Sequence, residues 1–240
     1  MAHLGKGTKG PALADGEYLL LCNPFPIFPA HFTLPSTRHV PQRIQGSFET
    51  LLEFTRQLGD EFTVFYNGPK CGASAPDHLH FQAAPAGLMP VEKELREPGI
   101  RAEVRKRGSA DIWRAAGLGR GVIVIEGARA AGVAAAFDEV MRALSRAARS
   151  EDEPMMNVFC THSGEGWRLM IFPRLKHRPA AYEREGEGKL SVSPGAVEMG
   201  GMFVTHREED FRALDPGLIG EIFREVAFDD AAVETLFAAL

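Results

Sequence analysis

The order of the predicted elements repeats once along this chain, and this repeat constrains the fold more than any other feature of the sequence. Each cycle reads as strand, helix, strand, turn and strand. The first cycle occupies residues 31–35, 44–58, 62–66 and 77–82. The second occupies residues 121–126, 133–147, 156–160 and 168–174. Because identities between the cycles are weak, the repeat predicts a duplication at the level of structure.

Hydrophobic spacing supports these assignments. Residues 44–58 carry apolar side chains at the i, i+3, i+4 spacing of an amphipathic helix. Three prolines within residues 23–29 exclude a helix or a central strand there. We expect that segment to run extended along a sheet edge, with Phe25, Ile27 and Phe28 packed inward.

Two further segments lie outside the cycles. The charged run at residues 92–107 predicts a solvated excursion or a short helix. Residues 210–240 predict a helical C-terminal segment that is broken at Pro216-Gly217.

Composition excludes several classes of protein. The 240 residues are 45% hydrophobic and 25% charged, which is typical of a soluble globular protein. A net charge of −5 argues against a general nucleic-acid binder. No stretch is apolar and long enough to span a membrane, and the N-terminus lacks the apolar core of a signal peptide. Residues 1–15, rich in Gly and Ala, are predicted to be disordered.

The cysteines indicate the redox setting. Cys22, Cys71 and Cys160 are far apart and form no C-x-x-C pair. We therefore expect no disulfide framework, and we expect a reduced, cytoplasmic location.

The segment Asp77–Gln82 (Asp-His-Leu-His-Phe-Gln) carries the most chemistry. Its polar and apolar residues alternate, as in a half-buried strand. On such a strand His78, His80 and Gln82 share one face, while the side chains between them enter the core. The glycine-containing turn at residues 67–74 precedes the strand and offers backbone amides that can hold an anion.

Other interpretations of the two histidines remain open at this point. Histidines at this spacing also occur on strand surfaces and in satisfied cores. A metal site formed by His78 and His80 is compatible with a strand, but the sequence offers no convincing third ligand.

These residues resemble the active-site signature of the histidine triad superfamily. The matching residues are Asn67, Gly72-Ala73-Ser74 and His78-x-His80-x-Gln82. With glutamine in its third position, the motif resembles that of the transferase branch. This branch includes galactose-1-phosphate uridylyltransferase, diadenosine tetraphosphate phosphorylase and GDP-hexose phosphorylases. The resemblance covers roughly residues 18–212, and further short motifs resemble an uncharacterised bacterial family of this group. The chain departs from the phosphorylase pattern by one extra residue, Asp77, and it lacks the cysteine pair of some uridylyltransferases.

The resemblance implies an α+β, histidine-triad-like fold with two pseudo-repeated halves, each with a mainly antiparallel sheet and a packed helix. We expect a single domain at residues 16–240. Its halves would span about 16–90 and 118–206, followed by the C-terminal helical segment at 207–240.

The resemblance also implies a role for each residue on the strand. His80 is the nucleophile that attacks an α-phosphorus and forms a nucleotidyl-histidine intermediate. His78 supports and orients His80, for example through its backbone carbonyl. Gln82 hydrogen-bonds a non-bridging phosphate oxygen.

Phosphate binding is expected at the preceding turn and at nearby cations. The amides of Gly72, Ala73 and Ser74 form an anion nest, and the Ser74 hydroxyl adds a donor. Asn67 matches a phosphate-contacting asparagine of the superfamily. The candidate cations are Lys70, Arg174 and Lys176, for each of which a solvated surface role is the alternative.

The function implied is nucleotidyl transfer, in the form of phosphorolysis of a nucleoside diphosphate-sugar or a dinucleoside polyphosphate. Inorganic phosphate or a phosphosugar is the acceptor. The alternatives are a hydrolase of nucleotide conjugates and a non-catalytic nucleotide-binding module. Mg²⁺ carried by the nucleotide is the only cofactor suggested, and no protein-bound metal, nucleic acid or membrane partner is expected. A homodimer is common in the resembled families.

Overall fold

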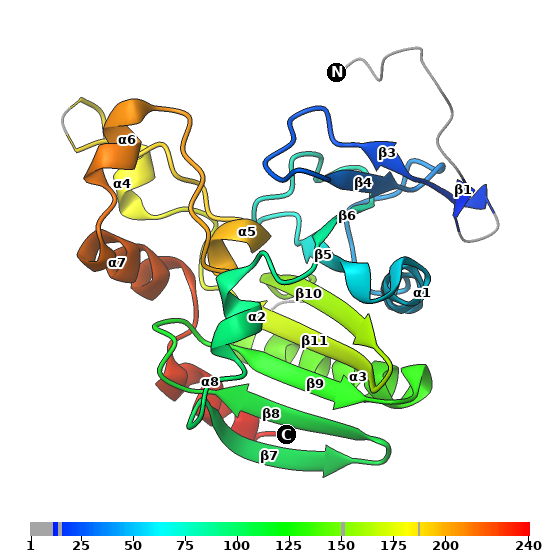
Figure 1. Ribbon diagram of the computed structural model, residues 1–240. Coiled ribbons are helices and arrows are strands. Elements are labelled where there is room, and N and C mark those ends of the chain that lie inside the picture. Colours follow the sequence, from blue (N-terminus) through cyan, green and yellow to red (C-terminus); the bar gives the residue numbers. More distant parts are fainter. Residues whose placement is uncertain (1–11, 14–15, 150–151, 187) are drawn as a thin grey trace.

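One antiparallel sheet of nine strands forms the centre of the protein in the computed structural model, which describes residues 12–13, 16–149, 152–186 and 188–240 (Figure 1). The strand order is β3-β4-β6-β5-β10-β11-β9-β8-β7. The strands are β3 (Leu21–Cys22), β4 (Phe32–Pro35), β5 (Phe62–Asn67), β6 (His80–Pro85), β7 (Arg101–Arg107), β8 (Ala110–Ala115), β9 (Ile123–Gly127), β10 (Met156–Ser163) and β11 (Gly166–Pro173). A separate two-stranded sheet pairs β1 (Ala12–Leu13) with β2 (Tyr18–Leu19).

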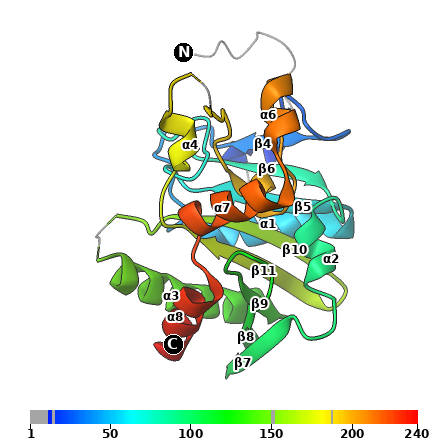
Figure 2. The ribbon, with the colours of Figure 1, turned by 90° about the vertical axis from the view of Figure 1, so that its left-hand side faces the viewer.

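Helices cover both faces of the large sheet. The first face packs on α1 (Phe48–Leu58), α3 (Ala130–Ala148) and α8 (Asp230–Ala238), and α3 lies beside α8 in Figure 2. The second face packs on α2 (Pro90–Glu94), α5 (Ala196–Met199) and α7 (Pro216–Val226). The remaining helical elements are α4 (Ala180–Glu183), α6 (Glu208–Ala213) and the 3₁₀ turn η2 (Gly59–Glu61).

The repeat predicted from the sequence is visible in the sheet order. The series β4, α1, β5, β6 recurs as β9, α3, β10, β11, and the order β4-β6-β5-β10-β11-β9 is symmetric about its centre. This confirms the α+β class and the two similar halves. The sheets of the two halves form one continuous sheet, because β5 pairs with β10 from Asn67 opposite Asn157 to Val64 opposite Cys160. The domain limits at 16–90, 118–206 and 207–240 stay a prediction.

Alternation along the central strands decides which side chains lie on which face. In β6, Phe81 and Ala83 belong to the core beneath α1, whereas His80 and Gln82 point to the second face. On that second face the neighbouring strand contributes Phe65. The candidate site is therefore on the face opposite α1 and α3.

The charged run at 92–107 was predicted correctly only in part: its first residues belong to the short helix α2 (Pro90–Glu94), but residues 101–107 form a strand. It contains β7, which pairs with β8 in a hairpin at the edge of the sheet. Charged side chains on an edge strand protect it from pairing with other chains, and here they mask the period-two signal. The strand β8 was also missed, because its adjacent residues Ile112 and Trp113 are both buried and break the period-two pattern.

The proline-rich segment is oriented differently from the prediction. Phe28 is buried as expected, but Phe25 is 83% exposed and Ile27 38% exposed. The Asn23 side-chain oxygen accepts from the Phe25 amide at 2.9 Å, so the chain turns outward there. The C-terminal segment is helical, and Pro216 begins α7 because proline is tolerated in a first helical turn.

The predicted disorder of residues 1–15 falls mostly outside the described residues. Ala12–Leu13 contradict it, because they pair with β2. No helix within the described ranges is long and apolar enough to cross a membrane.

Candidate active site

His80 is the first residue of β6, and its two ring nitrogens have different surroundings. Nδ1 lies 2.9 Å from the backbone oxygen of His78. A carbonyl can only accept, so Nδ1 carries the proton and donates it. Nε2 is buried and has no hydrogen-bond partner among the described residues. The ring therefore presents an unprotonated Nε2 with a free lone pair, which is the form that a nucleophile requires.

Burial keeps this imidazole neutral. His80 is only 5% exposed, and desolvation lowers its pKa below the ordinary histidine value of 6.5. The bond to the His78 carbonyl acts in the opposite direction but is the smaller influence on the pKa. At neutral pH the lone pair on Nε2 is therefore retained.

Gln42 fixes the backbone of His80. Its Nε2 donates to the oxygens of Asn67 at 2.9 Å and of His80 at 3.0 Å, and its Oε1 accepts from the His80 amide at 2.8 Å. The side chain is 1% exposed and all its hydrogen-bonding ends are used. It thus replaces a strand partner at the point where β5 and β6 diverge. No pattern in the sequence predicts this role for Gln42.

His78 does not share the strand face with His80, as the sequence had predicted, because β6 begins only at His80. Its ring Nε2 donates to the Ser36 carbonyl at 2.8 Å, and its Nδ1 lies 3.0 Å from Nδ1 of His39. His78 is therefore held by the segment before β6, and its carbonyl contacts the His80 ring. Within the described ranges there is no group of three metal-ligating side chains that could hold a metal ion.

Gln82 follows on the same face of β6. Its Oε1 lies 2.8 Å from Nε2 of His31, a residue that precedes β4. Position 82 pairs with Thr33 of β4 and Phe65 of β5, so the amide stands between two strands. No sequence pattern connects His31 with Gln82, because the two residues are 51 positions apart.

The turn at Gly72–Ser74 has free backbone donors. Among the described residues, no acceptor faces the amides of Gly72, Ala73 and Ser74. Gly72 has φ +92, and a Cβ there would lie 2.6 Å from the Cα of Gly195. Only glycine permits this approach, which presses the turn against the segment before α5.

We expect Gly72→Ala to destabilise the protein more than Gly99→Ala. Gly99 has φ +85 but open space around its Cβ position, so both substitutions carry a similar backbone cost. Overlap with Gly195 should add about 2 kcal/mol to the loss of unfolding free energy at position 72. Urea unfolding of both variants measures this difference, and equal losses would contradict the close packing of the two loops.

Asn67 holds the turn to the loop before α5. Its Oδ1 accepts from Asn157 Nδ2 at 2.8 Å and from the Ala196 amide at 2.7 Å. Asn157, which is fully buried, also donates to the Cys71 carbonyl at 2.7 Å and accepts from Arg174 at 2.6 Å. The side-chain nitrogen of Asn67, Nδ2, donates to no described residue and remains free for a ligand.

Arg174 lies at the end of this network and is 3% exposed. Its guanidinium donates to the carbonyls of Val226 at 3.0 Å, Pro194 at 2.9 Å, Lys176 at 3.2 Å and His177 at 3.0 Å, besides the bond to Asn157. Its donors are thus engaged within the protein. We assign Arg174 to holding these segments together and leave it out of the candidate phosphate-contacting groups.

The other two candidate cations are exposed. Lys70, next to the turn, lies 3.8 Å from Asp152. Lys176 lies 2.6 Å from Glu225. Neither ion pair is buried, so either side chain can turn to an anionic ligand at little cost.

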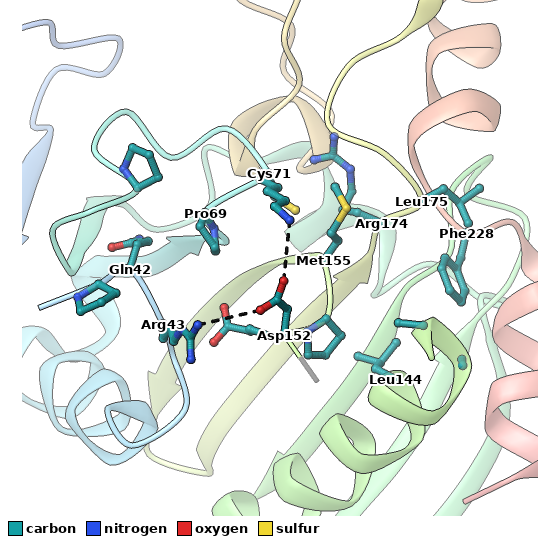
Figure 3. Close-up of a pocket in the computed structure, with 17 residues that line it drawn as sticks. Gln42, Arg43, Pro69, Cys71, Leu144, Asp152, Met155, Arg174, Leu175 and Phe228 are labelled. Carbon is teal, nitrogen blue, oxygen red and sulfur yellow. Dashed lines mark ion pairs between the residues drawn. The ribbon is translucent and has the colours of Figure 1, made fainter. Parts of the chain in front are cut away.

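A cavity of about 490 Å³ adjoins the back of this turn (Figure 3). Gln42, Pro69 and Cys71 line one side of it, and Leu144 and Phe228 line the other. Neither His80 nor Gln82 lines this cavity. It therefore touches the supports of the site without reaching the candidate nucleophile.

Two family models match this chain. Residues 8–85 match a domain of unknown function, DUF4922, and residues 108–239 match the family described as GDPGP1-like, C-terminal domain. The chain belongs to the GDPGP1-like family. The match covers the second half of the repeat and the C-terminal helices, and the histidine strand lies within the DUF4922 match. No curated protein matches the sequence significantly.

Solved structures share the fold of this GDPGP1-like chain. Yeast Ap4A phosphorylase Apa2, solved in complex with Ap4A, superposes with a TM-score of 0.65 at 20% identity, over 90% of this chain and 75% of that one. A DUF4931 family protein from Bacillus cereus gives a TM-score of 0.50 at 14% identity, over 81% and 95% of the two chains. These matches confirm the histidine-triad-like fold expected from the sequence.

Proposed function

We propose that this protein is a nucleotidyltransferase that works by phosphorolysis through a nucleotidyl-His80 intermediate. The observation that carries the proposal is the unpaired Nε2 of a buried, neutral His80. Membership of the GDPGP1-like family and the fold shared with an Ap4A phosphorylase support the same class of reaction.

The first step forms a bond between Nε2 of His80 and an α-phosphorus. The bond from phosphorus to the leaving oxygen breaks, and the leaving phosphate or sugar phosphate takes its electron pair. The His80 ring becomes positively charged in this adduct, and the bond from Nδ1 to the His78 carbonyl, 2.9 Å long, stabilises that charge. In the second step inorganic phosphate attacks the same phosphorus, releases a nucleoside diphosphate and restores His80.

The surrounding groups would stabilise the charge on the transferring phosphorus. The free amides of Gly72, Ala73 and Ser74 are fixed dipoles of the kind that stabilise such charge without reorganisation. Gln42 links this turn to the nucleophile, because it binds the backbone of both Asn67 and His80. Gln82 is proposed to bind a non-bridging oxygen, and Lys70 and Lys176 to bind outer phosphates.

The substrate we propose is a dinucleoside polyphosphate or a nucleoside diphosphate-sugar. Phosphate exchange tests this without knowledge of the sugar or the second nucleoside. Because the second step is reversible, the enzyme should move labelled inorganic phosphate into the β position of ADP or GDP. Incorporation supports phosphorolysis. Release of nucleoside monophosphate from Ap4A or GDP-glucose without incorporation would indicate a hydrolase, and neither reaction would leave only a binding module.

The pH dependence of exchange should reflect the lowered pKa of His80. Protonation removes the lone pair on Nε2, so the rate falls as pH falls through this pKa, and the acid limb should lie below 6.5. The unfolded histidine binds its proton at higher pH than the folded one, so His80 also makes the fold less stable as pH falls below 6.5. The pH profile of kcat/KM, with NMR titration of the ring, measures the limb. An acid limb assigned to His80 above 6.5 would contradict this.

A further inference from the structure

The geometry points to His31 as a positioning residue that sets the orientation of the Gln82 amide. This inference rests on the proposed function, because it concerns how Gln82 meets the transferring phosphate. The observation behind it is the distance of 2.8 Å between His31 Nε2 and Gln82 Oε1.

His31 is built into the sheet edge rather than exposed beside it. It is 6% exposed, and its ring packs 5.4 Å from the ring of Phe28 and 6.0 Å from that of Phe65. The Asn23 amide donates to its carbonyl at 2.8 Å, which closes the proline-rich loop onto β4. The imidazole therefore has little freedom to turn.

The tautomer of His31 follows from its second nitrogen. The backbone amide of Ile27 points at Nδ1 from 3.4 Å, and a backbone amide can only donate. Nδ1 is thus the acceptor, and Nε2 carries the proton. This agrees with the closer neighbour of Nε2, because the Gln82 oxygen lies at 2.8 Å, whereas the side-chain nitrogen of Asn23, which can only donate, lies at 3.4 Å. Burial lowers the pKa of the ring, so this neutral form persists at neutral pH. The Nε2–H then donates to Gln82 Oε1.

This donation decides which end of Gln82 faces a ligand. An amide has one accepting and one donating end, and an ionised phosphate oxygen can only accept. With its oxygen held by His31, Gln82 presents its NH₂ group to the second face of the sheet. A Gln82 amide turned the other way would place oxygen against oxygen and would repel the substrate.

Substitution of His31 separates this role from packing. His31→Phe keeps an aromatic ring against Phe28 and Phe65 but removes the donor, whereas His31→Gln keeps an N–H donor at a similar distance from the backbone. We expect phosphate exchange into ADP or GDP to fall about tenfold in His31→Phe, a part of the 10²–10³ that loss of a whole oxyanion donor costs. His31→Gln should recover part of the loss. His162→Phe, at the far end of β10 against Trp167, is the matched control and should exchange normally.

A double-mutant cycle supplies the decisive measurement. If His31 acts through Gln82, then His31→Phe has no further effect in a Gln82→Ala background. The preference between the two α-phosphorothioate diastereomers of ADP should also shrink in both single variants, since Gln82 contacts only one non-bridging oxygen. A purely structural role would leave this preference intact.

The outcomes distinguish the inference from the proposed function. Absence of exchange in the wild-type protein overturns the proposed function. Normal exchange in the wild type and in His31→Phe overturns only the role of His31. The role of His31 is also overturned if His31→Phe lowers exchange by the same factor in the wild-type and Gln82→Ala backgrounds and leaves the diastereomer preference unchanged.

Discussion

Replacement of His80 by alanine should abolish nucleotidyl transfer and leave the fold intact. We expect the exchange of labelled phosphate into ADP or GDP to fall by about 10⁴-fold or more, the scale seen when a covalent nucleophile is removed. The substitution removes the proposed reacting atom, Nε2, which has no hydrogen-bond partner among the described residues. The structural bond that it also removes is the single donation from Nδ1 to the His78 carbonyl.

Covalent labelling gives a second, independent measurement. Wild-type protein incubated with ADP or GDP should gain the mass of a nucleotidyl group, and the bond should be acid-labile and base-stable, as phosphorus–nitrogen bonds to histidine are. His80→Ala should gain none. The control is His39→Ala, which removes an exposed histidine that contacts His78 but not His80.

If His80→Ala retained both exchange and labelling while circular dichroism and thermal unfolding matched the wild type, the nucleophile would lie elsewhere. If His80→Ala lost activity together with its folded structure, His80→Asn, which retains a polar side chain in the same buried site, would be measured under the same conditions. Retained activity in that folded variant would also remove His80 from the mechanism.

Local patterns predicted the elements of this fold well where one face is apolar and the other polar. The spacing that predicts α1 and α3 and the β-rich runs of β5 and β10 survive in the structure. The edge strand β7 was not predicted, because its charged side chains do not show the alternation of polar and apolar residues that indicates a strand. The meeting of β5 and β10 at the centre could not be predicted from either segment, because register between strands is set by contacts far apart in sequence.

In the candidate site, too, contacts between residues close in sequence could be predicted, whereas contacts between distant residues could not. The contact between His80 and the His78 carbonyl was implied by the family resemblance as one way for His78 to support His80, and the structure contains it. The clamp by Gln42 and the bond from His31 to Gln82 span 38 and 51 residues. No local pattern distinguishes a glutamine or histidine at such a position from a surface residue. Their roles become visible only once the strands are paired.

Arg174 provides the second large effect, and it should appear in stability. We expect Arg174→Met to lower the free energy of unfolding by about 3 kcal/mol or more, because each buried acceptor left unpaired costs about 1–3 kcal/mol. The carbonyls of Pro194 and Val226 and Oδ1 of Asn157 would lose their donor, while methionine fills much of the volume. Guanidinium unfolding of the whole chain measures the loss.

Lys176→Met is the matched control, since it removes a cation two residues away whose ion pair with Glu225 is exposed. Its effect on unfolding should stay below about 1 kcal/mol. If Arg174 instead contacted phosphate directly, Arg174→Met would keep its stability and lose exchange. That pattern would return Arg174 to the phosphate-binding set, whereas a large loss of stability identifies it as the residue that joins β11, α7 and the loop before α5 behind the Gly72 turn.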